Sequence, residues 1–473
     1  MPDFRGSVLR GERDIAAYSQ DMSGMRIAPR CVAIPSDDQD IGPLFGYAEG
    51  AAIPITPRGA GSNQSGSAVG PGIIVPTTRM NRIEVSATGI VRVQAGAIHA
   101  RVDDELASIS RRLAYDPSSR TFCTIGGNVG TKASGLRGLK YGSVDRWVES
   151  VRFVCPGFGT VDTRNPSREL KGAIGELRDE ARSDDTVSGF VKRRKGLKSS
   201  SGYNLDALFD HDEPGEIIAH LMCGSVGTLG FVTDVALRTI PLPERKMLLL
   251  AFPDSLRGAI NAGLALRGFG PSALELVDEY GLAQMADAGI ATPPDSKVLL
   301  MIEFDENAEA LAARAADYLA GKGVEARRLN DAGSVSRAWK VREAMLLRIK
   351  RQMENGSTIV PPFVEDLAVP PDELPSFSAE VLGAMTKMGL KPVVYGHAGE
   401  GNLHFRLPIP KADGEALTTR LGDECVGIAL SHGGTVTAEH GSGRLRLRYA
   451  EREFPRPVLE LFDRTKDAFD PKG

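Results

Sequence analysis

The sequence has few cysteines and no long apolar run. Its 473 residues contain five cysteines, and no two of them form a C-x-x-C pair. Such scattered cysteines argue against an iron–sulfur cluster or a zinc ribbon within this chain and favour a reducing cytoplasm. We find no run of about 18 apolar residues that could span a membrane. The polar start, MPDFRGSVLRGERD, lacks the apolar core of a signal peptide.

A strong charge of one sign is also lacking. The formal net charge is −4, with 42% apolar and 25% charged residues, which is typical of a soluble globular protein and gives no reason to expect nucleic-acid binding. A chain of 473 residues is too long for one ordinary core, so we expect two or three domains. The acidic run at 176–185 and the basic run at 192–198 together favour a solvated loop.

The apolar pattern alternates between short strands and helices. GIVRVQAGA (89–97) alternates as a strand, and the apolar spacing that follows predicts a helix over 98–113. A later helix is predicted within 305–323, with Asp305 as its N-cap. Two prolines and several charges in RTIPLPERK (238–246) indicate a domain boundary. The alternation beyond it indicates an antiparallel or mixed sheet covered by helices.

Three glycine-rich segments stand out. The first, TPRGAGSNQSGSAVGPGIIVPTT (56–78), runs into a strand and not into a helix, so it is not a Rossmann fingerprint. Its backbone amides could form a nest for phosphate, although a structural turn explains the segment nearly as well. Similar segments lie at 116–148 and at 200–209 with 223–241. Together, three such loops could wrap one long, flat, phosphate-bearing cofactor.

Two of the seven histidines lie close together in YGHAGEGNLH (395–404). The glycines make a helix improbable, so a strand, a tight turn and a second strand are expected. In that hairpin His397 and His404 would converge near the turn. Taken alone, a structural hairpin with semi-buried imidazoles explains the stretch as well as a functional site does.

Seven stretches resemble the FAD-dependent D-2-hydroxy acid dehydrogenases, which belong to the vanillyl-alcohol-oxidase-type (VAO-type) flavoproteins: PRGAGSNQSG, TIGGNVGTKASGL, KYG, GSVGTLG, YGHAGEGNLH, TAEHGSG and FDPKG. They cover residues 15–473 in the family's order. The resemblance implies an α+β fold with a two-lobed FAD-binding domain of the PCMH type at 1–242. A substrate (cap) domain with an antiparallel sheet would follow at 243–420, and a C-terminal segment at 421–473 would return to the flavin.

The resemblance also implies where FAD is held, without a covalent link. Its pyrophosphate would lie on the first glycine loop, and the second and third glycine-rich segments would close the site. The residues implied as FAD-binding are Arg58, Gly59, Ala60, Gly61, Ser62, Asn63, Gln64, Ser65, Thr124, Gly126, Gly127, Asn128, Ser134, Gly227 and Gly230.

A divalent metal is implied by the same resemblance. TAEHGSG supplies Glu439, which with His397 and His404 makes two imidazoles and one carboxylate. Similar family members bind Zn²⁺ there, and sometimes Mn²⁺ or Fe²⁺. A metal at this place would stabilise the alkoxide that develops when a 2-hydroxy acid gives its α-hydrogen as hydride to flavin N5.

Three further residues are implied as catalytic. His440 is the candidate base for the hydroxyl proton, with a hydrogen-bonding role outside the reaction as the alternative. Arg342 would grip the substrate carboxylate through two hydrogen bonds, and Asn402 would contact substrate or flavin. Arg444, Arg446 and Arg448 alternate, and they could read a second carboxylate or form a solvated strand edge.

The sequence departs from the family at three positions. Val226 stands where glutamate is frequent, Ser442 stands where isoleucine or aspartate is common, and Val364 stands where several members have a lysine that helps bind the substrate carboxylate. The identity of the 2-hydroxy acid therefore stays open among D-lactate, D-2-hydroxyglutarate and glycolate.

The implied function is a flavoprotein dehydrogenase that oxidises a D-2-hydroxy acid. A non-catalytic FAD-binding electron-relay subunit of a glycolate-oxidase-like complex is the alternative, and such subunits lack the His–His–Glu set. The implied electron acceptor is an iron–sulfur protein or subunit, or an electron-transfer flavoprotein. We expect a cytoplasmic protein, at most peripheral to a membrane through that partner, and leave a homodimer open.

Overall fold

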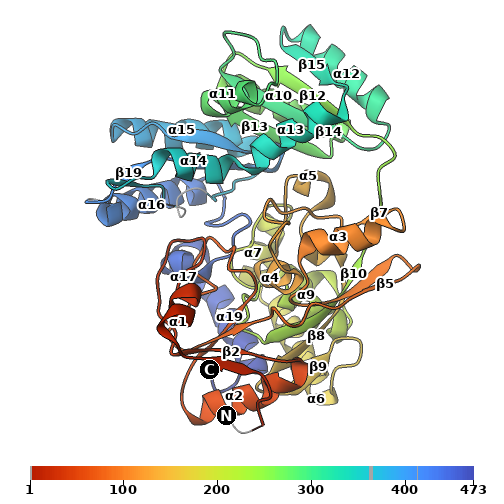
Figure 1. The fold of residues 1–473 in the computed structure, drawn as a ribbon, viewed down its shortest axis with the longest axis vertical. Coiled ribbons are helices and arrows are strands. Elements are labelled where there is room, and N and C mark those ends of the chain that lie inside the picture. Colours follow the sequence, from red (N-terminus) through yellow and green to blue (C-terminus); the bar gives the residue numbers. More distant parts are fainter. Residues whose placement is uncertain (1–2, 362–365, 413) are drawn as a thin grey trace.

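Helices and strands alternate along the computed structural model, which describes residues 3–361, 366–412 and 414–473. Two smaller sheets with their helices form the lower part of the molecule, and one six-stranded sheet with its helices forms the upper part (Figure 1). The α+β class expected from the sequence is confirmed. Position 364, where the family comparison noted valine in place of lysine, lies outside the described residues.

The first lobe is a four-stranded sheet near the N-terminus. β3 and β2 run parallel to β4, and β1 is antiparallel to β2. Alternating apolar residues of these strands pack on helix α2 (Ile41–Gly50). In spatial order the strands are β1 (Ser7–Leu9), β2 (Cys31–Ile34), β4 (Ile73–Pro76) and β3 (Ile55–Arg58).

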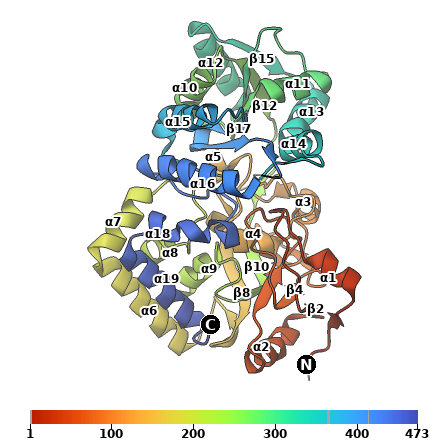
Figure 2. The ribbon, with the colours of Figure 1, turned by 90° about the vertical axis from the view of Figure 1, so that its left-hand side faces the viewer.

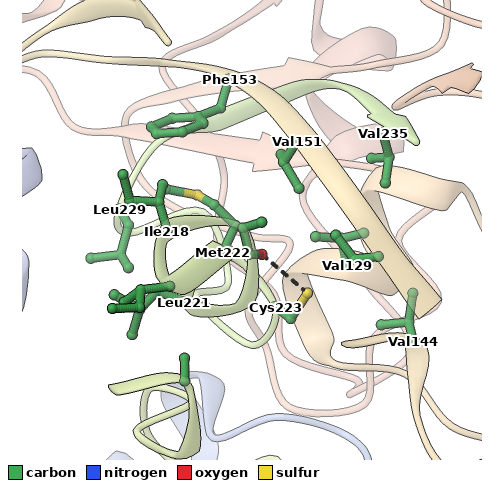
Figure 3. Packing of buried hydrophobic residues seen from close by; sticks show 14 of the residues in the cluster. Val129, Val144, Val151, Phe153, Ile218, Leu221, Met222, Cys223, Leu229 and Val235 are labelled. Atoms are coloured by element: carbon green, nitrogen blue, oxygen red, sulfur yellow. Dashed lines mark hydrogen bonds between the residues drawn. The ribbon is translucent and has the colours of Figure 1, made fainter. Parts of the chain in front are cut away.

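The second lobe is an antiparallel five-stranded sheet. It contains the strand expected at 89–97, which is β6, and helix α9 (Pro214–Met222) packs its apolar side on this sheet. Met222 and Cys223 lie in the centre of that core, with Val151 and Phe153 of β8 around them (Figure 3). In spatial order the strands are β5 (Ile83–Val85), β6 (Ile90–Gln94), β10 (Phe231–Arg238), β8 (Val148–Cys155) and β9 (Gly159–Asp162).

The helix expected over 98–113 is shorter than predicted. α3 spans His99–Ala107, and Ser110 then takes a left-handed conformation with φ of 57°. The chain turns there so that β7 (Arg111–Arg112) can pair with β11 (Ile240–Pro241). Ile109 is consequently exposed, because the pairing of β7 with a strand distant in sequence overrides the helical spacing.

The acidic and basic runs at 176–198 do not form the predicted loop. Residues 176–183 lie in helix α6 (Arg168–Ser183) and residues 185–194 lie in α7 (Asp185–Arg194), so only 195–198 of the basic run lie outside a helix. α6 buries an apolar stripe at helical spacing, and α19 (Arg456–Phe469) lies beside it (Figure 2). The charges therefore form the solvated faces of two amphipathic helices. The loop was predicted from charge alone, although apolar residues recur at helical spacing in the same segment.

The upper unit is the antiparallel sheet that the sequence predicted. One face packs on α10 (Leu256–Leu266), α12 (Ala308–Gly321) and α15 (Leu374–Lys387). The opposite face is covered by three other helices, α11 (Glu279–Asp287), α13 (Ala332–Glu343) and α14 (Met345–Met353). In spatial order the strands are β15 (Glu325–Leu329), β12 (Met247–Phe252), β14 (Val298–Phe304), β13 (Ala273–Asp278), β17 (Val393–His397) and β18 (Asn402–Arg406).

Asp305 is not the N-cap predicted for the helix in this unit. α12 begins after Asn307, whose side chain makes no capping bond. Asp305 instead accepts hydrogen bonds from Lys140 Nζ and Tyr141 Oη, both at 2.6 Å. It therefore ties the lower unit to the upper one.

The C-terminal part of the chain returns to the lower unit. α16 (Gly414–Ser431) still packs on the upper core, so the expected division at 420/421 falls inside a helix, whereas the one at 242/243 falls between the sheets. After α16 the chain passes 439–443 and ends in α19, whose apolar residues join the core of the second lobe (Figures 1 and 2). We propose that the upper unit extends to Ser431.

None of the helices in the described residues is long and apolar enough to cross a membrane.

Candidate active site

One cavity lies where the two units meet and is lined by both. From the lower unit come the loop 58–64, parts of 117–135 and the loop 225–232. From the upper unit come the junction of α13 with α14 and the strands β17 and β18. Glu439 and His440, on the returning C-terminal segment, complete the wall.

The loop 59–64 presents its backbone amides to this cavity. None of its N–H groups donates a hydrogen bond to another group in the part of the chain that the structure describes. The loop leads into β4 and not into a helix, as expected. Successive free amides form a nest that suits a phosphate or pyrophosphate. The loop therefore fits the phosphate part of a dinucleotide cofactor.

Arg58 fixes the shape of this loop. Its guanidinium donates to the carbonyls of Ala68 and Gln20, each at 2.9 Å. It passes so close to Gly61, whose φ is 73°, that a Cβ there would lie 2.3 Å from an Arg58 nitrogen. Gly61 is thus required both by its conformation and by the approach of Arg58.

Most residues implied as FAD-binding line the same cavity. Ser65 does not, because it is buried behind the loop, where its hydroxyl donates to Asn63 Oδ1 at 2.9 Å or to the His440 carbonyl at 3.0 Å. Besides Arg58, those in the cavity wall are Gly59, Ala60, Gly61, Ser62, Asn63, Gln64, Thr124, Gly126, Gly127, Asn128, Ser134, Gly227 and Gly230.

Val226 also lines the cavity, in a strained conformation. Its φ of 47° lies in the left-handed region that β-branched residues avoid, at a cost of about 1–3 kcal/mol. Its N–H donates to the carbonyl of Gly130 at 2.8 Å, which holds the 225–230 loop against α4 (Ile125–Thr131). A side chain therefore projects from this strained position into the cavity.

The hairpin predicted at 395–404 is confirmed. Tyr395 pairs with His404 and His397 pairs with Asn402 across β17 and β18. Residues directly opposite each other share a face of the sheet, so His397 and His404 both point to the side covered by α13 and α14. Their ring centroids are 5.7 Å apart. The turn requires Gly401, because a Cβ there would lie 2.0 Å from the Val369 carbonyl.

His397, His404 and Glu439 form the cluster predicted as a metal site. One nitrogen of each imidazole and one oxygen of Glu439 lie within 4.8 Å of one another. Nε2 of His397 is 3.3 Å from Glu439 Oε2, and Nε2 of His404 is 3.7 Å from Oε1. Tetrahedral ligation at about 2.0–2.2 Å needs donors about 3.4 Å apart, so the donor set fits Zn²⁺ or a similar ion.

A second possible donor set shares Glu439 with the first. It consists of Asp366, Glu439 and His440. Asp366 is already occupied, because its carboxylate accepts from Thr437 Oγ1 at 2.5 Å and from the backbone N–H of His440 at 3.0 Å. The His397–His404–Glu439 set is therefore the better site.

The sequence analysis missed two charged residues beside Glu439. Lys198 Nζ lies 3.2 Å from Glu439 Oε2 and 3.2 Å from Glu400 Oε2. Burial alone would favour neutral Lys198, but Glu400 and Glu439 outweigh it and raise the pKa of its ammonium group. Lys198 and His397 in turn hold the pKa of the Glu439 carboxyl well below its usual range, against the effect of burial. Glu439 is thus a charged carboxylate in a buried site.

Glu275 is a third residue that the sequence analysis missed. It lies on β13 with 1% of its surface exposed, and its Oε1 is 2.6 Å from His397 Nδ1. Its other oxygen, Oε2, forms an ion pair with the guanidinium of Arg342. Burial opposes the charge on Glu275, but Arg342 and His397 lower the pKa of its carboxyl. Burial likewise disfavours a protonated His397, yet Glu275 and Glu439 raise the pKa of its imidazole to about 9.

Arg342 and His440 are both in the cavity wall, as predicted. The Arg342 guanidinium carbon lies 4.9 Å from the centre of the Tyr395 ring. His440 Nδ1 is 3.3 Å from Asp366 Oδ2, and its Nε2 is 3.2 Å from Gln64 Nε2 on the amide loop. Because an amide NH₂ can only donate, Gln64 meets the Nε2 lone pair, and the proton lies on Nδ1 toward Asp366.

Other predicted residues lie away from the cavity. Asn402 is fully buried and donates to the Leu367 carbonyl at 2.9 Å, outside the cavity wall. The arginines of the strip are not on a strand: Arg444 and Arg446 lie on α17 (Gly443–Arg446), and Arg448 follows it. None of the three lines the cavity, and Arg446 faces Asp366 at 3.9 Å. The strip prediction is wrong, because the chain is helical there.

Two family models match the chain. "FAD binding domain" matches residues 29–163, and "FAD linked oxidases, C-terminal domain" matches residues 242–473. These matches agree with the unpaired amides of the first glycine loop. They support FAD as the cofactor of this chain.

Curated relatives carry the names of related enzymes. D-2-hydroxyglutarate dehydrogenase of Escherichia coli is 28% identical over 99% of this chain and 50% of its own length. D-lactate dehydrogenase of Archaeoglobus fulgidus is 28% identical over 97% of this chain and 94% of its own length. Glycolate oxidase subunit GlcD of Bacillus subtilis is 28% identical over 96% of this chain and 90% of its own length. The chain spans about half the length of the hydroxyglutarate dehydrogenases that it matches.

The fold is shared with a solved structure of another protein. Alkyldihydroxyacetonephosphate synthase superposes on the whole chain with a TM-score of 0.69 at 17% identity, and 82% of that chain is covered. The two-lobed lower unit and the antiparallel sheet of the upper unit, both expected from the sequence, are confirmed. The chain therefore carries both of these domains, the FAD-binding domain over residues 29–163 and the C-terminal domain of FAD-linked oxidases over residues 242–473.

Proposed function

We propose that the chain oxidises a D-2-hydroxy acid to the 2-oxo acid with FAD and a divalent metal ion. The observation that carries this proposal is the buried His397–His404–Glu439 cluster, which opens into the same cavity as the unpaired amides of 59–64. The names of the relatives support the substrate class. An electron-relay subunit would need the FAD loops but not this cluster of imidazoles and carboxylates.

Each bound group would contribute one part of the chemistry. Bound FAD would supply a hydride acceptor, and a bound metal ion would supply a Lewis acid for the substrate oxygens. His397, His404 and Glu439 would hold the ion, and the 59–64 amides would hold the FAD phosphates. His397 and His404 lie on the upper unit, Glu439 lies on the returning C-terminal segment and the 59–64 loop lies on the lower unit, and all of them line one cavity.

Arg342 would bind and orient the substrate carboxylate. It is positioned from two sides, by its ion pair with Glu275 and by the face of Tyr395. A guanidinium held in this way loses little freedom when it forms two parallel hydrogen bonds to a carboxylate. This contact fixes the α-carbon of the substrate relative to the flavin.

His440 would accept the hydroxyl proton at Nε2. The Nδ1 proton faces Asp366, whose carboxylate is fixed by backbone N–H groups of residues 439 and 440. Gln64 Nε2 occupies the Nε2 lone pair now, and a substrate hydroxyl would take its place as the donor. This arrangement orients the imidazole as a base toward the cavity.

Anaerobic bleaching of the flavin tests the proposal. Holoenzyme is mixed without oxygen with D-lactate, glycolate, D-2-hydroxyglutarate or D-malate, and the loss of yellow colour is followed. We expect one of these acids to bleach the flavin rapidly and an artificial dye to reoxidise it much faster than air does. A yellow protein that none of them bleaches would favour the relay subunit. Rapid peroxide formation would contradict a dehydrogenase.

The comparison of dye with air tests whether the reduced flavin passes its electrons to a partner protein. All five cysteines are free and buried. We propose an iron–sulfur protein or an electron-transfer flavoprotein as the acceptor. One relative, the Bacillus subtilis GlcD protein, is named a subunit of glycolate oxidase.

FAD is expected to be bound without a covalent link. Cys123 is the thiol nearest the FAD loops in sequence, and it is 3% exposed. Burial raises the pKa of its thiol to about 11, so little thiolate is available to attack the flavin. Acid precipitation should release the yellow colour into the supernatant. A pellet that stays yellow after washing would show a covalent bond.

A further inference from the structure

We infer that Glu275 is a positioning residue that serves both the metal site and the substrate-binding arginine. The inference rests on the proposed function and deepens it. Glu275 does not line the cavity. It acts through His397 on one side and Arg342 on the other.

The contact with His397 fixes which nitrogen faces the metal site. A carboxylate can only accept, so the hydrogen on Nδ1 of His397 points to Glu275 Oε1 at 2.6 Å. Nε2 then points toward Glu439 and the cavity, where its lone pair would bind the metal ion in place of a hydrogen. Carboxylate–histidine–metal arrangements of this kind raise the basicity of the ligand and fix its ring orientation.

The contact with Arg342 uses the other carboxylate oxygen. Both partners are almost fully buried, with side-chain exposures of 4% for Arg342 and 1% for Glu275. A buried arginine without a nearby anion would destabilise the folded state. The Glu275 carboxylate offsets this charge and holds the Arg342 guanidinium against Tyr395. Each oxygen of Glu275 thus faces one partner: Oε1 faces the His397 imidazole, and Oε2 faces the Arg342 guanidinium in an ion pair.

The strand explains why this carboxylate reaches both partners. Val277 of β13 pairs with Tyr395 of β17, so Glu275 lies two residues along on the same face, next to His397. Its neighbours Leu274 and Leu276 point into the opposite core. β13 lies next to β17 and under α13, so the side chain of Glu275 reaches both His397 on β17 and Arg342 on α13.

The division of its two oxygens predicts the effect of an amide. Glu275→Gln keeps the volume but offers one accepting oxygen, so its NH₂ group must face either the Nδ1 hydrogen or the guanidinium. Either orientation leaves a buried donor without its acceptor. We expect metal affinity to fall about 10–100-fold, the usual effect of losing such a carboxylate. At saturating metal, KM for the substrate should rise more than kcat falls, because Arg342 loses its anchor.

A neighbouring glutamate provides the matched control. Glu303 lies on β14 with the same 1% exposure and the same face of the sheet. Its carboxylate binds Arg137 through two bonds, of 2.6 Å and 2.7 Å, outside the cavity wall. Glu303→Gln removes an equally buried charge. Its metal affinity should stay within about twofold of the wild-type value.

The test measures Zn²⁺ affinity by equilibrium dialysis of FAD-loaded protein and steady-state kinetics with the acid that bleaches the flavin. Wild-type metal affinity in Glu275→Gln, or an equal loss in Glu303→Gln, would overturn the metal part. An unchanged KM would overturn the arginine part. If Glu275→Gln does not fold, Glu275→Asp should show a smaller loss of metal affinity, and wild-type affinity there would also overturn it. Absence of bleaching in the wild-type protein would instead count against the proposed function.

Discussion

His404→Ala is expected to lose most bound metal while keeping FAD. The substitution leaves His397 and Glu439 as a two-ligand site, whereas the FAD loops belong to the other unit. Turnover should fall at least about 100-fold, because a Lewis acid contributes several kcal/mol and each 1.36 kcal/mol corresponds to about a tenfold change in rate. Elemental analysis, flavin absorbance and dye-linked turnover measure these three quantities.

His432→Ala is the control for this variant. His432 follows α16 and contacts Glu373 and Glu380 near the molecular surface, far from the cavity wall. It should keep wild-type metal content and turnover. The metal site is wrong if His404→Ala retains full metal content, or if the wild-type protein stays active in the presence of a strong chelator.

His440→Gln should have the second-largest effect, with a different signature. Metal and FAD stay bound, but the flavin is reduced about 100- to 10,000-fold more slowly, the usual cost of a lost general base. Glutamine can still hydrogen bond to Gln64 or Asp366, yet it cannot accept the hydroxyl proton. Stopped-flow reduction of the FAD-loaded protein by the substrate measures the rate directly.

The metal content of His440→Gln separates two roles of this residue. Unchanged metal with slow reduction supports His440 as the base. A loss of metal would mean that the Asp366–Glu439–His440 set holds the ion. A reduction rate within a few-fold of wild type would remove His440 from the reaction.

Local patterns predicted some parts of this molecule correctly. The hairpin of His397 and His404 follows from glycines that only a turn tolerates and from the two-residue alternation of strands. The amide loop at 59–64 likewise follows from glycine and serine before a strand. These features depend on backbone conformation, which neighbouring residues largely determine.

Predictions that rested on one local property, such as apolar spacing or charge, failed where contacts with residues distant in the sequence determine the local structure. The helix over 98–113 stops at Ala107 because β7 pairs with β11, which is more than 100 residues away in the sequence. The charged runs of 176–198 are largely helical because their apolar positions find a core in the second lobe. Asp305 does not cap a helix, because its carboxylate accepts a hydrogen bond from Lys140 on the other unit.

The sequence by itself determined which ligands are available and on which local elements they lie. The His–His hairpin, Glu439 with His440, and the glycine loops could all be found from residue type and spacing. Only the tertiary structure decided which charged side chains lie beside these residues. Glu275 and Glu303 are both buried acids on the same face of largely apolar strands, yet one faces His397 and the other faces Arg137. A buried charge must find a partner, and the partner is set by which strands and helices become neighbours.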